Sequence, residues 1–95
     1  MTAAIETVRL RITGQVQGVG YRFWMTHTAS SLGLRGWVRN RADGSVEALV
    51  TGPPEAVAAM VEASRRGPHG AHVRNVTATQ DQDDGRVGFV ALPTE

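Results

Sequence analysis

Three glycines and one arginine stand close together in the run Gly14-Gln15-Val16-Gln17-Gly18-Val19-Gly20-Tyr21-Arg22. Glycine reaches positive φ and lets the backbone approach a ligand closely, so successive N–H groups in such a turn can converge on an anion. A helix that starts at the end of the run would add its positive N-terminal end. Arg22 would add a planar fork of donors that fits two phosphate oxygens. The run therefore predicts a phosphate-binding site.

Two other kinds of phosphate loop are excluded by the chemistry that they need. A Walker-type loop ends in lysine followed by serine or threonine, and this chain contains no lysine. A cysteine phosphatase carries its nucleophile six positions before the arginine, where this sequence has Val16. A loop shaped only for chain reversal is the alternative that the run by itself leaves open.

The composition is that of an ordinary globular protein. The 95 residues are 41% hydrophobic and 20% charged, which suits one two-layer core but not two cores. A net charge of +1 gives no bulk attraction to nucleic acid or membrane, so recognition of an anion must be local. The absence of cysteine excludes disulfides and cysteine-ligated metals. Because the first residues lack the pattern of a signal peptide, we expect a cytoplasmic protein.

Hydrophobic periodicity and turn residues divide the chain into strands and helices. The glycine-rich run lies between an alternating strand and a helix, and Gly33 has the place of the left-handed residue that ends this helix. The predicted elements are strands at about 6–13, 35–40, 46–51 and 73–80, helices at about 21–32 and 53–64, and a short edge strand at 87–92.

The order of these elements, β-α-β-β-α-β, defines the expected fold class. It is α+β and ferredoxin-like: a two-layer sandwich in which two helices pack on one face of an antiparallel sheet. No linker or repeat interrupts the sequence. We therefore expect residues 1–95 to form a single domain with an ordered core at about 6–92.

RNA-recognition domains share this order of elements, but they need stacking aromatic residues on the open face of the central strands. Alternation places Arg9 and Arg11 on that face of the first strand. On the third strand it places Glu47, Leu49 and Thr51 there. The pattern argues against a nucleic-acid partner.

Four polar residues outside the run invite a functional interpretation. Asn40 ends a strand beside a turn, where asparagine is common for purely local reasons, and the residues alone favour that explanation. His27, His69 and His72 are scattered over different elements without the spacing of metal ligands. We expect the three histidines to be structural or solvated, and no metal site.

The run from Ile12 to Arg22 resembles the first signature of the acylphosphatase family. A second signature of that family is present as Gly36-Trp37-Val38-Arg39-Asn40, followed by Gly44-Ser45-Val46 and by Gly52. The resemblance covers essentially the whole chain, although Tyr21 stands where many relatives have Phe or Met. It implies an enzyme that hydrolyses the carboxyl–phosphate bond of small acyl phosphates to a carboxylate and inorganic phosphate.

The resemblance also implies which residues carry the reaction. Arg22 and Asn40 would be catalytic, because in this family the asparagine of the second signature orients the attacking water. The phosphate-binding loop would be formed by Gln17, Gly18, Val19, Gly20, Tyr21 and Arg22. The leaving group is a carboxylate, whose acid has a pKa of about 4, so it departs without a general acid. No metal and no cofactor are expected.

A second function remains open in the sequence. The same loop could serve a non-catalytic module that binds acyl or carbamoyl phosphate without turning it over. In either case we expect a small-molecule ligand, no nucleic-acid or membrane partner, and a monomer.

Overall fold

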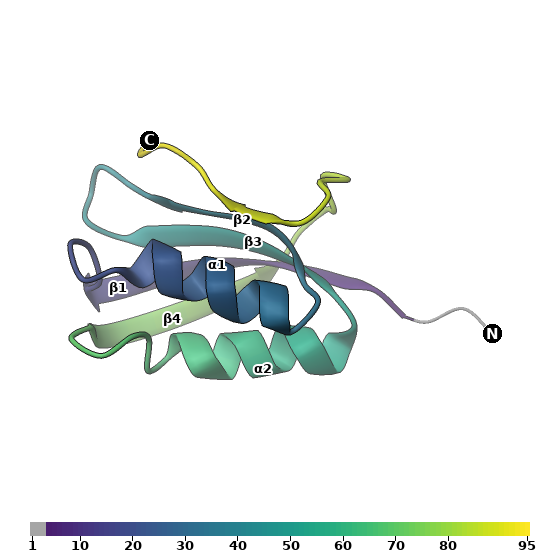
Figure 1. The fold of residues 1–95 in the computed structure, drawn as a ribbon, viewed down its shortest axis with the longest axis horizontal. Coiled ribbons are helices and arrows are strands. Elements are labelled where there is room, and N and C mark those ends of the chain that lie inside the picture. The colour runs from purple at the N-terminus through teal and green to yellow at the C-terminus, as the bar shows by residue number, and fades with distance from the viewer. Residues whose placement is uncertain (1–3) are drawn as a thin grey trace.

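The computed structural model describes residues 4–95; residues 1–3, which belong to the predicted single domain, lie outside the described residues. The elements follow one another as the sequence predicts (Figure 1). They are β1 (Glu6–Gln15), α1 (Tyr21–Ser31), β2 (Arg35–Asn40), β3 (Val46–Gly52), α2 (Pro54–Ser64), β4 (His72–Gln80) and β5 (Phe89–Ala91). The α+β, ferredoxin-like fold class is confirmed.

The strands form one sheet in the order β4-β1-β3-β2-β5. The neighbours among β1 to β4 are antiparallel, as expected. β5 adds an edge that runs parallel to β2, so the sheet is mixed at this side. The sequence predicted an edge strand at 87–92, but it gave no indication of this partner or direction.

β1 is longer than predicted. Its register against β4 shifts between Thr13 and Gly14, and beyond this irregularity Gly14 still pairs with Val73 and Gln15 with His72. The connection to α1 therefore begins after Gln15, not at Gly14. An irregularity of this kind bends a strand locally, and here it lies directly before the glycine-rich loop.

Both helices cover the same face of the sheet, and the core lies between the two layers (Figure 1). Alternation along the strands and helical spacing along α1 and α2 bring the apolar side chains together. The members with no exposed surface are Leu10, Ile12, Met25, Ala29, Val38, Val46, Ala48, Val50 and Met60. Gly33 ends α1 as predicted, with φ 72°, and the N–H of Leu34 donates to the carbonyl of Ala29 at 2.9 Å.

The opposite face of the sheet is polar. Arg9 pairs with Leu49 and Arg11 with Glu47, so the predicted alternation of β1 and β3 is confirmed. Trp37 also lies on this face, but it is only 7% exposed and the guanidinium of Arg39 covers its ring at 4.7 Å. No helix within residues 4–95 is long and apolar enough to cross a membrane.

Candidate active site

Two glycines shape the loop that joins β1 to α1, residues 16–20. Gly18 and Gly20 have φ values of 74° and 80°, in the left-handed region that favours glycine. Gly20 is the N-cap residue of α1, and no side chain caps this helix. Since a capping side chain would occupy N–H groups of the first turn, its absence leaves these groups to another acceptor.

The backbone N–H groups of residues 17–22 donate no hydrogen bond to an acceptor within residues 4–95. The bond that starts α1 runs from the N–H of Trp24 to the carbonyl of Gly20, at 3.0 Å. The N–H groups before it are those that the start of a helix leaves without an internal partner. Together with the positive end of the helix dipole they can hold an anion.

Arg22 stands in the first turn of α1, and its partly buried side chain lines the cleft beside the loop. Within the described part of the chain its guanidinium has no carboxylate partner. A cation at the N-terminal end of a helix is unfavourable because the helix dipole is positive there. A bound anion would compensate both charges at once.

Tyr21, directly before Arg22, fixes the start of α1 to α2. Its ring is 2% exposed, and its hydroxyl donates to the carbonyl of Ser64, the last residue of α2, at 2.7 Å. Burial raises the pKa of the Tyr21 hydroxyl to about 12. The ring lies against Gly67, where a side chain would collide with it. This anchor holds the first turn of α1, which also carries Arg22.

Asn40 is the last residue of β2 and lies on the helix-covered face of the sheet, because it pairs with the fully buried Val46. The N–H of Glu95 donates to the carbonyl of Asn40 at 3.1 Å, so a neighbouring segment also holds its backbone. The partly buried side chain of Asn40 reaches the same cleft as Arg22.

The cleft gathers residues from three places in the sequence and has a volume of about 470 Å³. Of the residues predicted for the site, it brings together Gly18, Gly20, Tyr21, Arg22 and Asn40. Gln17 and Val19, also predicted for the loop, do not line it. Val19 packs against the core instead.

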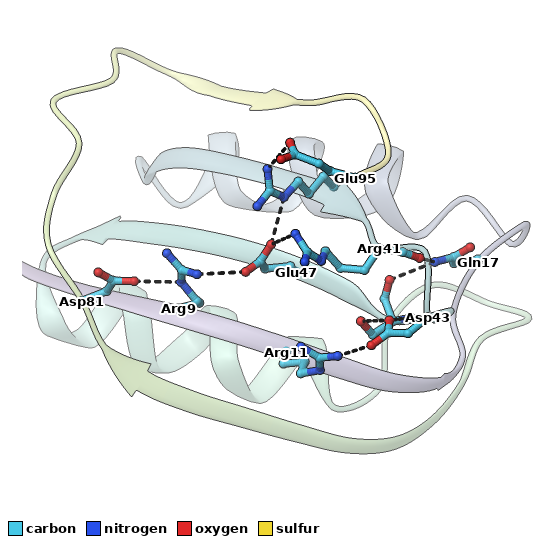
Figure 2. A network of polar contacts seen from close by, with 10 residues as sticks. Arg9, Arg11, Gln17, Arg41, Asp43, Glu47, Asp81 and Glu95 are labelled. Carbon is cyan, nitrogen blue, oxygen red and sulfur yellow. Dashed lines mark hydrogen bonds and ion pairs between the residues drawn. The ribbon is translucent and has the colours of Figure 1, made fainter.

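The side chain of Gln17 points to the turn between β2 and β3, residues 41–45 (Figure 2). Its amide nitrogen donates to the carbonyls of Arg41, at 2.8 Å, and Ser45, at 2.9 Å. Asp43 holds the same turn by accepting hydrogen bonds from the hydroxyl and N–H of Ser45, and these bonds hold the pKa of Asp43 below its usual value.

A comparison with known families identifies the chain. The model of the acylphosphatase family matches residues 8–91. This chain belongs to the acylphosphatase family. The family predicted from the two signatures is thus confirmed, together with its activity, the hydrolysis of acyl phosphates.

Individual acylphosphatases are similar over nearly the whole chain. The acylphosphatase of Bradyrhizobium diazoefficiens is 54% identical over 100 aligned positions, which cover 99% of this chain and 99% of the relative. That of Rhodospirillum rubrum is 50% identical over 90 residues, 95% of this chain and 99% of the relative.

Solved structures agree with the fold. The crystal structure of the acylphosphatase from Bacillus subtilis superposes with a TM-score of 0.88 at 34% identity, covering 94% of this chain and 99% of that one. Full-length HypF, in its phosphate- and nucleotide-bound form, matches 99% of this chain with 13% of its own. Its TM-score is 0.91 at 20% identity, which is a likeness of fold alone.

Sequence reasoning missed four residues that line the acylphosphatase cleft: Val16, Phe23, Thr26 and Ala91. Phe23 is 80% exposed, and the sequence contained a feature that could have indicated its place in the cleft. It lies off the apolar stripe of α1, beside an arginine that was predicted to bind phosphate. Ala91 comes from β5, and no local pattern could connect it with Arg22, because their proximity depends on how β5 pairs.

The three histidines remain outside the cleft lining of this acylphosphatase. His27 is exposed on α1, and its ring lies nearly parallel to that of Phe23, with centroids 6.4 Å apart. His69 and His72 are exposed on the connection after α2 and on β4. Within residues 4–95 no three His, Asp or Glu side chains are grouped as metal ligands would be.

Proposed function

We propose that this chain hydrolyses small acyl phosphates with Arg22, Asn40 and the loop amides as its machinery. The observation that carries the proposal is the shared cleft. An arginine without a carboxylate partner in the described part of the chain and an asparagine from another element line one hollow beside unpaired N–H groups. These are the groups that a tetrahedral anion and an attacking water would need.

In the proposed reaction the guanidinium of Arg22 and the N–H groups of residues 17–22 hold the phosphoryl oxygens. These donors stabilise the charge that the transition state spreads over those oxygens. The carboxamide of Asn40 holds a water in line with the bond between phosphorus and the acyl oxygen. That bond breaks as the new bond to phosphorus forms, and the carboxylate leaves with the bonding electrons.

No residue of the two signatures is placed to act as a general base. We propose that the proton of the water passes to a phosphoryl oxygen of the substrate. The carboxylate needs no proton to leave, because its acid has a pKa of about 4. Catalysis would then consist of positioning and charge stabilisation, which dominate enzymatic phosphoryl transfer in general. Neither a metal nor a cofactor takes part in this scheme.

Further parts of the proposal come from the sequence. We propose that residues 1–95 form a single domain of a monomeric enzyme that resides in the cytoplasm and has neither nucleic acid nor membrane as a partner. Light scattering after size exclusion tests the monomeric state, and a molecular mass of two chains would contradict it.

The decisive experiment is the release of phosphate from acetyl phosphate in the presence of a chelator. We expect turnover that chelation does not reduce. Turnover lost on chelation and restored by a divalent cation would contradict the metal-free scheme. Tight binding of inorganic phosphate without any turnover would show the non-catalytic module instead.

A further inference from the structure

We infer that Gln17 is a positioning residue, which sets the distance between the phosphate-binding loop and Asn40. The inference rests on the roles proposed above for Arg22 and Asn40. Its basis is the pair of hydrogen bonds from the Gln17 amide nitrogen to the carbonyls of Arg41 and Ser45, at 2.8 and 2.9 Å (Figure 2). A primary amide carries two N–H donors, so one group can bind both carbonyls.

The two carbonyls belong to a turn that starts directly after Asn40. Arg41 is the next residue in the chain, and Ser45 precedes β3. The N–H of Arg41 donates to the carbonyl of Ser45 at 2.8 Å, and the N–H of Gly44 donates to the carbonyl of Arg41 at 3.1 Å. Gln17 therefore binds the closed base of the turn. Because Asn40 directly precedes this turn, the two hydrogen bonds tie Gln17 to the position of Asn40.

This turn is held independently of Gln17. One oxygen of Asp43 accepts from the N–H and hydroxyl of Ser45, at 3.0 and 2.6 Å, and the other pairs with Arg11 on β1. Asn40 itself pairs with Val46 of β3. The asparagine side of the cleft is thus a fixed frame.

The loop, residues 16–20, is not held against the turn by several contacts of this kind. Within residues 4–95 the two bonds from Gln17 are the only hydrogen bonds between the loop and the turn at 41–45. Without them the N–H groups of the loop and Arg22 could still bind phosphate, but their distance from Asn40 would no longer be fixed. Catalysis is sensitive to such a change, since a displacement of about 1 Å can lower the rate roughly 100-fold.

The test compares Gln17→Ala with Gln15→Ala, which removes an exposed glutamine two residues earlier. We expect Gln17→Ala to lower kcat for acetyl phosphate by roughly 10- to 100-fold, while the inhibition constant of inorganic phosphate stays within about two-fold. Gln15→Ala should change neither. A weaker phosphate inhibition at unchanged kcat would overturn the inference, because Gln17 would then affect only the phosphate-binding loop and not its distance from Asn40. An unchanged kcat and inhibition constant would overturn it as well.

A pH profile separates positioning from general loosening of the fold. In Gln17→Glu the ionised carboxylate faces two carbonyl oxygens and has no proton to donate, whereas the protonated acid regains one donor. The ratio of its kcat to that of the original protein should rise several-fold from about pH 7.5 to about pH 5, and the ratio for Gln17→Ala should stay flat. Parallel profiles for both variants would contradict the role.

A double variant completes the test. If Gln17 acts through Asn40, adding Gln17→Ala to Asn40→Ala should lower the remaining kcat by no more than about two-fold. Full additivity would overturn the inference. Failure of the proposed function looks different, because the original protein would then release no phosphate from acetyl phosphate at all.

Discussion

Arginines stand on both sides of this sheet, and their surroundings differ completely. On the open face Arg9, Arg39 and Arg41 all pair with Glu47, at N–O distances of 3.0, 2.9 and 3.4 Å (Figure 2). In the cleft on the helix-covered side, Arg22 has no carboxylate partner within residues 4–95. The same residue type is thus neutralised in one region and left available in the other.

An arginine that can bind an anion thus differs from the others in its partners and not in its residue type, since its charge is not already paired with a carboxylate. Glu47 is 7% exposed, and three guanidiniums share its charge, so an incoming anion would have to compete with a carboxylate that is already in place. Arg22 sits beside N–H groups and a helix end that add to its positive potential. No carboxylate within residues 4–95 lines the cleft and competes with an entering anion.

The largest effect on activity should follow from removing the charge of Arg22, which has no carboxylate partner within residues 4–95. Arg22→Ala should lower kcat/KM for acetyl phosphate by roughly 10³-fold or more and abolish inhibition by inorganic phosphate. Arg22→Lys should recover only part of this, since lysine lacks the planar fork. The control is Arg9→Ala, which we expect to stay within about two-fold of the original activity. Equal losses for Arg9→Ala and Arg22→Ala would abolish the distinction between the two regions.

A smaller loss of activity should follow from substitution of Asn40, the proposed uncharged catalytic residue in the cleft. Asn40→Ala should lower kcat by roughly 100-fold, because the water loses the group that orients it, while inorganic phosphate still inhibits as before. Initial rates at saturating acetyl phosphate and phosphate inhibition constants measure the two effects. Asn75→Ala, on the exposed part of β4, serves as the control. Normal turnover in Asn40→Ala would remove the water-orienting role.

On the open face the corresponding change should affect stability instead. Glu47→Gln leaves Arg9, Arg39 and Arg41 facing one another without their shared carboxylate, and should lower the free energy of unfolding by about 1–3 kcal/mol. Urea denaturation measures this. Glu62→Gln, whose side chain is 72% exposed, should cost less than about 0.5 kcal/mol. Matching losses for these two variants, or a large fall in kcat for folded Glu47→Gln, would contradict the comparison.

An effect that appears only at alkaline pH concerns Tyr21, the buried residue directly before Arg22. Its pKa is about 12 in the folded protein against an ordinary value of 10.0, so above pH 10 the unfolded state gains by losing the proton first. Stability should fall by about 2–3 kcal/mol between these two values, relative to Tyr21→Phe. Urea denaturation at stepwise increasing pH measures the difference.

Absorbance provides a direct check, because the chain has a single tyrosine. In the folded protein the phenolate should form near pH 12. A Tyr21 that titrates at its ordinary pKa would show that the ring is accessible to water, and the anchor to Ser64 would then be refuted.

The sequence predicted what depends on local pattern. Alternation identified the two faces of β1 and β3, hydrophobic periodicity predicted both helices, and the place of Gly33 predicted the end of α1. These features depend on residues that are close together in the chain, so the sequence itself shows which residues determine them.

The site was only partly accessible to the same reasoning. Glycines before a helix pointed to an anion and to Arg22, but Asn40 needed the family resemblance, because its residue type suits an ordinary turn equally well. The bonds from Gln17 and the contribution of Ala91 to the cleft lay beyond prediction. They arise from the register of segments far apart in the sequence, and one residue of slip would place other groups there.

The last residues of the chain have a practical consequence for handling this enzyme. Glu95 binds the carbonyl of Asn40 through its N–H, accepts a hydrogen bond from the N–H of Ala42 and pairs with Arg39. A purification tag or surface linker fused behind Glu95 would therefore emerge beside the reacting centre. In Figure 1 the start of β1 lies at the far side of the sheet from the C-terminus, so a tag placed before β1 would be joined farther from Asn40.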